Sequence, residues 1–262
     1  MELKQQREAA FHDSAYTHGV RTHVSNYYLI LDGCHSFYRG HLRTQCKGAR
    51  VLELGCGMDS NAFFMSREGV ASVVGIDISS VAIAQAEQRA ARENIQRAQF
   101  RVMDAEALDF PDNSFDLICG AAILHHLDLH RTLSELARTL APNGTAIFLE
   151  PLCHNPVINL YRRLTPALRT EDEHPLSMAD LKGMEKYFSK IDKQYFHLTS
   201  LAAAPFYKMP AFDKLVHFCD TSDRALFKIA PFLRRYAWTV GLIFSKPVKT
   251  AQAATAATVR AK

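Results

Sequence analysis

Short apolar runs alternate with helix-like segments over residues 50–151, and this alternation limits the folds open to the chain. The runs are RVLEL, VASVVGID, AQFRVMD, FDLICGAA and TAIFLEP. Between them lie segments with helical spacing, such as SSVAIAQAEQRAARENI and RTLSELARTLAPNG, which we expect to stay helical up to Asn143–Gly144. Strands that alternate with helices form βαβ units. The segment therefore predicts an α/β fold with five parallel strands.

The flanking segments extend this plan. KQYFHLTSLAAA predicts a sixth strand and YAWTVGLIFSK a seventh, which we expect to be antiparallel and to insert beside the sixth. Phe, Leu and Lys at helical spacing over residues 205–232 predict an inserted helical segment. We divide the chain into a helical N-terminal lid (1–48), a core (49–151), the remainder of the sheet with a substrate-side cap (152–247) and a disordered tail (248–262).

Composition excludes several classes of protein. The 262 residues are 48% hydrophobic and 22% charged, as in a globular protein, and the net charge of +4 comes without a basic stripe. Six cysteines form no CxxC pair, which argues against a zinc framework or a redox dithiol. The charged N-terminus is unlike a signal peptide, and no apolar run has the roughly 20 residues of a membrane span. We expect a cytoplasmic protein with no nucleic-acid partner.

A glycine loop and three acids follow successive predicted strands. RVLEL leads into Gly55-Cys56-Gly57, where glycines let the backbone approach a ligand. Glu53 at that strand's end suits an ammonium group, and Asp77 at the end of the second strand suits ribose hydroxyls. Asp104 after the third strand suits an adenine amino group. These positions predict a cationic ligand that carries ribose and adenine.

The same segments resemble the class I S-adenosylmethionine-dependent methyltransferases. LELGCG resembles that family's first motif, VVGIDIS its second-strand motif, and VMDAEALDFPDNSFDLICGAAILHHL the region that follows. The resemblance covers residues 49–151 and implies a Rossmann-like sheet of seven strands with S-adenosylmethionine as cofactor. The implied cofactor-binding residues are Glu53, Gly55, Gly57, Asp77, Ile78, Asp104, Ala105 and Gly120. Met58-Asp59 departs from the family, which often has a third small residue there.

A histidine pair after the fourth predicted strand is the candidate catalytic feature. His126 matches the place where some small-molecule members of the family have a general base, and His125 matches it less well. His154 and His174 are further candidates. No HExxH or spaced HxH motif is present, so we expect no metal site.

Several functions stay open at this point. A small, partly apolar acceptor methylated at O or N is favoured, because no Asp/Asn-Pro-Pro-Tyr/Phe motif or cytosine-type Pro-Cys nucleophile is present. A macromolecular acceptor, a nicotinamide-dependent oxidoreductase and a non-catalytic S-adenosylmethionine-binding protein are the alternatives. Homodimer formation also stays open.

Overall fold

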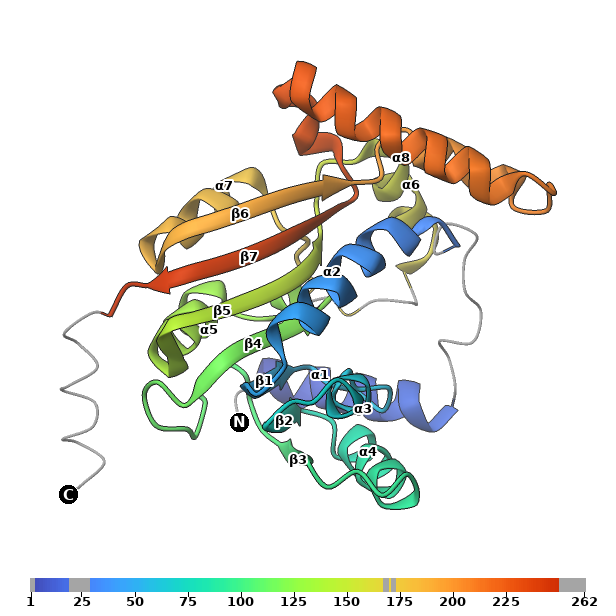
Figure 1. Ribbon diagram of the computed structural model, residues 1–262. Coiled ribbons are helices and arrows are strands. Elements are labelled where there is room, and N and C mark those ends of the chain that lie inside the picture. The colour runs from blue at the N-terminus through green and yellow to red at the C-terminus, as the bar shows by residue number, and fades with distance from the viewer. Residues whose placement is uncertain (1–2, 19–28, 167–169, 171–172, 250–262) are drawn as a thin grey trace.

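A seven-stranded sheet runs through the molecule (Figure 1). The computed structural model describes residues 3–18, 29–166, 170 and 173–249. The strand order is β3-β2-β1-β4-β5-β7-β6. The strands are β1 (Arg50–Leu54), β2 (Ser72–Asp77), β3 (Ala98–Val102), β4 (Phe115–Ala121), β5 (Leu140–Pro151), β6 (Phe188–Phe196) and β7 (Thr239–Pro247).

The pairing confirms the predicted topology. Strands β1 to β5 are parallel, and β7 lies antiparallel between β5 and β6. The chain order reverses at β1, which pairs with both β2 and β4. In open α/β sheets, ligands bind beyond the carboxyl ends of the strands at such a point.

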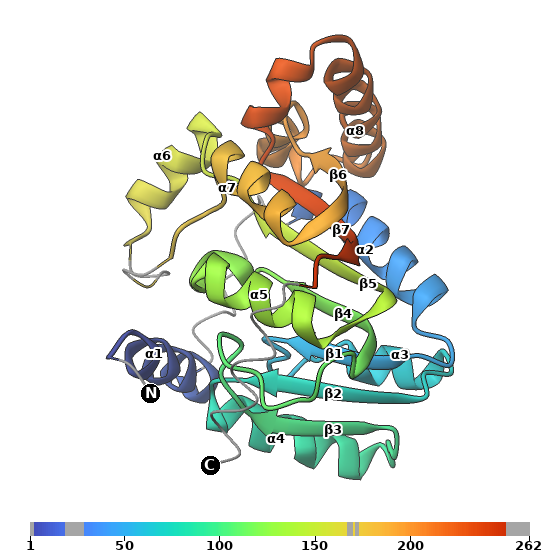
Figure 2. The same cartoon turned by 90° about the vertical axis from the view of Figure 1, so that its left-hand side faces the viewer.

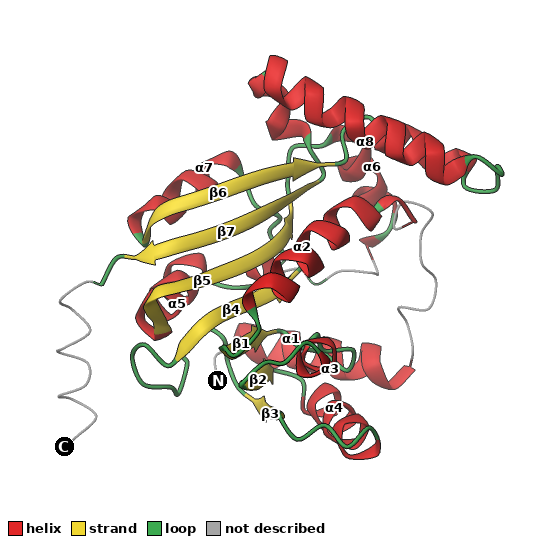
Figure 3. Ribbon diagram, viewed as in Figure 1, coloured by secondary structure: helices red, strands yellow, loops and turns green. Residues whose placement is uncertain are grey.

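Helices cover both faces of the sheet (Figures 2 and 3). The α-helices are α1 (Leu3–His18), α2 (Asp32–Gln45), α3 (Ala62–Arg67), α4 (Ser80–Arg92), α5 (Leu129–Thr139), α6 (Pro156–Leu164), α7 (Met178–Gly183) and α8 (Phe212–Ile229). The 3₁₀ helices are η3 (Leu124–His126), η5 (Met184–Lys186), η6 (Ser200–Phe206) and η7 (Pro231–Tyr236). None of the helices in the described part of the chain has the length and apolar character needed to cross a bilayer.

Two apolar layers form because successive strand residues point to opposite faces. Val51 belongs to the layer under α2, α3 and α4, whereas its neighbour Leu52 belongs to the layer under α5 and α7. Leu117 and Ile118 of β4 divide in the same way. Both faces of the central strands are therefore buried, which accounts for their continuous apolar runs.

Helix α5 ends earlier than the predicted limit at Asn143–Gly144. It stops at Thr139, and β5 begins at Leu140 with a register shift opposite the segment between Phe115 and Leu117. Pro142 disfavours the helical conformation at the residue before it, so the chain leaves the helix there.

The sixth strand lies earlier than predicted. It covers Phe188–Phe196, and the following residues Ser200–Phe206 form a 3₁₀ helix. His197 has a φ of +63°, which ends the extended backbone, and Asp223 accepts hydrogen bonds from the amides of Leu198 and Thr199 at 2.8 Å each.

The first and the last described segments of the chain both contact the rest of the fold. Helix α1 lies against α4, near the carboxyl ends of the strands (Figure 2). At the other end, the Val248 amide donates to the Tyr187 carbonyl at 2.8 Å, and the Lys249 ammonium donates to the Ala137 carbonyl at 2.6 Å. These first two residues of the predicted tail are therefore hydrogen-bonded to the rest of the fold, and its remaining residues 250–262 lie outside the described ones.

Candidate active site

The glycine loop after β1 has a backbone that other residues adopt only with strain. Gly55 and Gly57 have φ angles of +60° and +53°. A Cβ atom on Gly55 would lie 2.8 Å from the Ile123 side chain, and one on Gly57 would lie 2.8 Å from the Tyr16 hydroxyl oxygen. Glycine is required here by both the backbone and the close neighbours.

Asp77 holds this loop in place. Its side chain accepts a hydrogen bond from the Gly57 amide and another from the Ser79 amide, each at 2.9 Å and each on a different oxygen. Asp77 is 8% exposed and lines a cavity. Each carboxylate oxygen keeps a second lone pair, so Asp77 can still accept hydrogen bonds from a diol.

The third predicted acid, Asp104, lies at the same edge of the sheet as Asp77. Asp104 accepts a hydrogen bond from the Glu106 amide at 2.8 Å and lines the same cavity as Asp77. Ile78 and Ala105, the neighbours of these acids, also line it. The structure thus brings together the predicted positions at the ends of β2 and β3.

Glu53, in contrast, does not line the cavity. It is fully buried and accepts hydrogen bonds from the Ser60 hydroxyl, from the Asn61 amide at 2.9 Å and from the Ala62 amide at 3.2 Å. Burial raises the pKa of Glu53, and these hydrogen bonds oppose the rise. Glu53 is outside the cavity lining and instead satisfies the first amides of α3.

The two other predicted glycines also lie behind the cavity wall. Gly57 and Gly120 are absent from the lining, whereas Gly55, Ala121 and Ala122 are part of it. A Cβ atom on Gly120 would lie 2.8 Å from both Ile123 and Phe148, so this glycine permits close packing.

The cavity has a volume of about 570 Å³, within the range of small-molecule sites. Its lining combines residues that follow β1, β2 and β3 with residues of α1, η3 and α6 and the start of β7. Apolar side chains in the lining include Phe11, Leu31, Ile158 and Trp238.

The helical segment 205–232, which lies within the predicted substrate-side cap, contributes no residue to the cavity lining. Val216 and Phe227 are buried in the core, and Phe206 and Met209 are exposed. Within the predicted cap region, α6 and Trp238 reach the cavity instead.

His125 is held by a buried carboxylate. Its Nδ1 lies 2.8 Å from Glu150 Oε2, and the other Glu150 oxygen accepts hydrogen bonds from the amides of Ile123 at 3.0 Å and Leu124 at 2.9 Å. Glu150 therefore fixes both η3 and the orientation of the imidazole. The remaining nitrogen, Nε2, lies 3.9 Å from Glu173.

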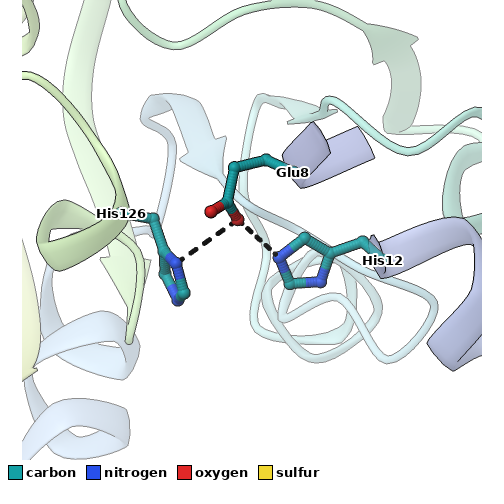
Figure 4. A group of neighbouring side chains, drawn as sticks. All are labelled: Glu8, His12 and His126. Atoms are coloured by element: carbon teal, nitrogen blue, oxygen red, sulfur yellow. Dashed lines mark ion pairs between the residues drawn. The ribbon is translucent and has the colours of Figure 1, made fainter. Parts of the chain in front are cut away.

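His126 faces the N-terminal helix (Figure 4). Its Nδ1 and the Nε2 of His12 each lie 3.5 Å from Glu8 Oε2. Burial raises the pKa of Glu8, but His12, His126 and Thr170 outweigh it and hold the pKa below its usual range. The sequence offers His12 as one of three unranked histidines of the predicted N-terminal lid, and it does not single out Glu8. The i, i+4 spacing of Glu8 and His12 on a helix places them on one face.

Of the other predicted histidines, neither His154 nor His174 lines the cavity. His174 donates its backbone amide to the His125 carbonyl at 2.8 Å. Its contribution to the site is therefore to the backbone around His125.

Comparison with known proteins agrees with this geometry. Residues 52–148 match the family model described as "Methyltransferase domain". These residues hold the glycine loop and the acids at the ends of β2 and β3. This segment of the chain is a methyltransferase domain of the class I S-adenosylmethionine-dependent type. S-adenosylmethionine is the cofactor of this family.

Individual relatives within this methyltransferase family match parts of the chain. The 27-O-demethylrifamycin SV methyltransferase of Amycolatopsis mediterranei is 35% identical over 99 residues, which are 37% of this chain and 36% of the relative. The fatty-acid O-methyltransferase of Mycolicibacterium smegmatis is 29% identical over 151 residues, 56% of this chain and 53% of the relative. The chain thus spans about a third to a little over half of these curated methyltransferases.

A solved methyltransferase has the same fold. The phosphoethanolamine N-methyltransferase 2 of Haemonchus contortus matches with a TM-score of 0.58 at 18% identity, covering 87% of this chain and 59% of that protein. That structure holds S-adenosylhomocysteine and phosphomonomethylethanolamine. At this identity the likeness concerns the fold alone.

Proposed function

We propose that this chain transfers a methyl group from S-adenosylmethionine to an oxygen or nitrogen atom of a small, partly apolar molecule. The observation that carries the proposal is one cavity whose lining combines the strand-end acids with apolar side chains and two histidines. The acids suit the nucleoside part of the methyl donor. We assign the part of the lining that holds the apolar side chains and the histidines to the acceptor, and call it the acceptor end.

The residues of the chain have distinct tasks in this proposal. Asp77 accepts hydrogen bonds from the ribose, Asp104 accepts one from the adenine amino group, and Gly55 lets the backbone approach the donor. Bound S-adenosylmethionine supplies an electrophilic methyl group on a sulfonium. Gly57, Gly120 and Glu53 support the loop and sheet around the donor.

The acceptor needs a group that takes its proton. His126 is the base predicted from the sequence, and it lines the acceptor end. His125 is the alternative that the geometry adds, because Glu150 orients its ring and leaves Nε2 for the proton. A histidine acts as a base through the unprotonated nitrogen of a neutral imidazole.

A small acceptor is favoured over a macromolecular one by the covering of the cavity. Helix α1 supplies Glu8, Phe11, His12 and Tyr16 to the wall, so the acceptor end lies under a helix. A non-catalytic S-adenosylmethionine-binding protein is the second candidate, because it would use the same cavity.

The experiment is a screen with S-adenosylmethionine that carries a radiolabelled methyl group, with fractionated small-molecule extracts as acceptors. We expect transfer of label into an apolar small-molecule fraction, and its loss in His125→Ala or His126→Ala. Calorimetry with S-adenosylmethionine runs in parallel. Binding without transfer to any fraction would favour the non-catalytic protein, and absence of binding would overturn the proposal.

A further inference from the structure

Glu8, His12 and His126 form a compact group of metal-ligand side chains at the acceptor end of the cavity (Figure 4). Their ligand atoms all lie within 4.8 Å of one another. Glu8 and His12 come from α1, and His126 comes from η3 on the other side of the cavity. The sequence contains no metal motif because the three residues meet only in the folded chain.

The distances within this group suit a shared ion better than hydrogen bonds. Both imidazole nitrogens lie 3.5 Å from Glu8 Oε2, beyond the usual 2.7–3.2 Å of an N–H···O hydrogen bond. Bonds of about 2.0–2.1 Å to a tetrahedral ion place neighbouring ligand atoms about 3.3–3.4 Å apart. The separations seen here are close to that value.

The group also holds buried polar atoms that lack a hydrogen bond. The Glu8 side chain is 7% exposed, and neither of its carboxylate oxygens has a hydrogen-bond partner among the described residues. The same is true of Nδ1 of His126. Both imidazoles lie 3.5 Å from Glu8 Oε2, and an ion bound among the three side chains would compensate the buried carboxylate more directly than these contacts do.

We propose that Glu8, His12 and His126 bind a divalent first-row transition-metal ion such as Zn²⁺. Two imidazoles and one carboxylate are typical ligands of such ions. Three protein ligands leave a coordination position open for the acceptor.

A second, neighbouring group of metal-ligand side chains supports a metal site less well. His125, His126 and Glu173 also have ligand atoms within 4.8 Å of one another. His125 already directs Nδ1 to Glu150 at 2.8 Å, so this group has no buried carboxylate left without a partner. The group with Glu8 is therefore the favoured site.

The ion would give the proposed reaction its acceptor. An ion held by Glu8, His12 and His126 would lower the pKa of an acceptor hydroxyl. Nε2 of His125 would take the proton and pass it to solvent. The acceptor oxygen would form its bond to the methyl carbon as the sulfur–methyl bond breaks, and S-adenosylhomocysteine would leave as a neutral thioether. This step rests on the proposed function and gives His126 the task of a ligand instead of a base.

The test is a titration of the metal-free protein with Co²⁺, whose visible absorption reports ligand number and geometry. We expect one Co²⁺ per chain with a tetrahedral-type spectrum, and at least tenfold weaker binding in Glu8→Gln and in His12→Gln. The controls are Glu87→Gln on α4 and His217→Gln on α8, both exposed residues that should leave the titration unchanged.

Binding by the wild type that equals binding by Glu8→Gln and His12→Gln would overturn the site, as would absence of binding. Circular dichroism confirms that each variant is folded. If Glu8→Gln does not fold, His12→Gln carries the test, since the His12 side chain is the more exposed one at 16%.

Calorimetry with S-adenosylmethionine on the same proteins separates this inference from the proposed function. Co²⁺ binding without S-adenosylmethionine binding would overturn the function and keep the metal site. S-adenosylmethionine binding without Co²⁺ binding would overturn the metal site alone.

Discussion

At the scale of single residues, one carboxylate has two tasks. Asp77 fixes the glycine loop through the amides of Gly57 and Ser79 and presents its remaining lone pairs to the cavity. The sequence predicted its place at the ligand edge from the strand end alone. It did not predict the hydrogen bonds to the loop, because these depend on how the chain turns after β1.

Replacing Asp77 should weaken the binding of S-adenosylmethionine. Asp77→Ala removes two ribose contacts to a charged group, which is expected to cost about 1.5–3 kcal/mol, or tenfold to 150-fold in Kd. Calorimetry measures the change. Asp213→Ala, on the exposed start of α8, is the matched control and should bind as the wild type does. Equal affinity of Asp77→Ala and the wild type would show that Asp77 serves the loop only.

Replacing His126 should affect turnover and leave the donor bound. His126→Ala is expected to lower kcat about 10²–10⁴-fold, the usual contribution of a general base or an equivalent activating group. Its affinity for S-adenosylmethionine should stay within about threefold, since the donor contacts come from other strands. Activity above a tenth of the wild type would mean that positioning alone drives the transfer.

At the scale of elements, the ends of a helix or strand are harder to predict than its presence. The alternation of apolar runs predicted each strand of the core. At the start of α4, the Ser79 side chain is the N-cap and accepts a hydrogen bond from the Ala82 amide. The end of α5 and the position of β6 depended on Pro142 and on the left-handed backbone of His197. The sequence predicted that Glu53 contacts the ligand, because its position at a strand end does not reveal that the segment 60–62 folds back and hydrogen-bonds to it.

Glu53 should contribute to stability. Glu53→Ala leaves the Ser60 hydroxyl and the amides of Asn61 and Ala62 without their buried acceptor, so the free energy of unfolding should fall by about 2–4 kcal/mol. Urea denaturation measures this. Glu87→Ala on the exposed face of α4 should change it by less than about 0.5 kcal/mol. A similar small change in Glu53→Ala would show that the loop is satisfied by other groups.

Helix α1 should loosen when its contact with α4 is removed. Asp13 accepts hydrogen bonds from the Ser79 hydroxyl at 2.5 Å and the Val81 amide at 3.3 Å, at the N-terminus of α4. Loss of a contact worth about 1 kcal/mol should raise hydrogen exchange of the α1 amides roughly fivefold in Asp13→Ala. Exchange in α5, on the opposite face, is the internal reference. Unchanged exchange in α1 would mean that other contacts hold the helix.

At the scale of the whole molecule, the cavity joins segments that are far apart in the sequence. Its wall includes Glu8, Asp77, His126 and Trp238, so the site forms only when the N-terminal helix, the core and β7 are all in place. Motifs in the sequence single out the lining residues that follow β1, β2 and β3. The lining residues from α1, α6 and the start of β7 carry no motif, because they meet only through tertiary contacts.

The methyl donor should therefore stabilise the whole protein. At a concentration of 100 times Kd, S-adenosylmethionine should add about 2.7 kcal/mol to the free energy of unfolding. For a chain of this size, that corresponds to a rise in Tm of about 5–10 °C. Differential scanning calorimetry measures the rise, with ATP as a control for adenine alone. A rise with NAD and none with S-adenosylmethionine would point to the oxidoreductase alternative.

The position of β7 between β5 and β6 also determines when the protein can be completed during synthesis. In the described part of the chain, β6 hydrogen-bonds only to β7, and β7 comes about fifty residues later in the sequence. When β6 has left the ribosome, β7, the strand that joins β6 to the sheet, has not yet been released. Until then β5 keeps an unpaired apolar edge, which is the kind of surface that chaperones bind and that aggregates form from. Truncation near the C-terminus would therefore cost this protein an interior strand, where many folds would lose only a peripheral one.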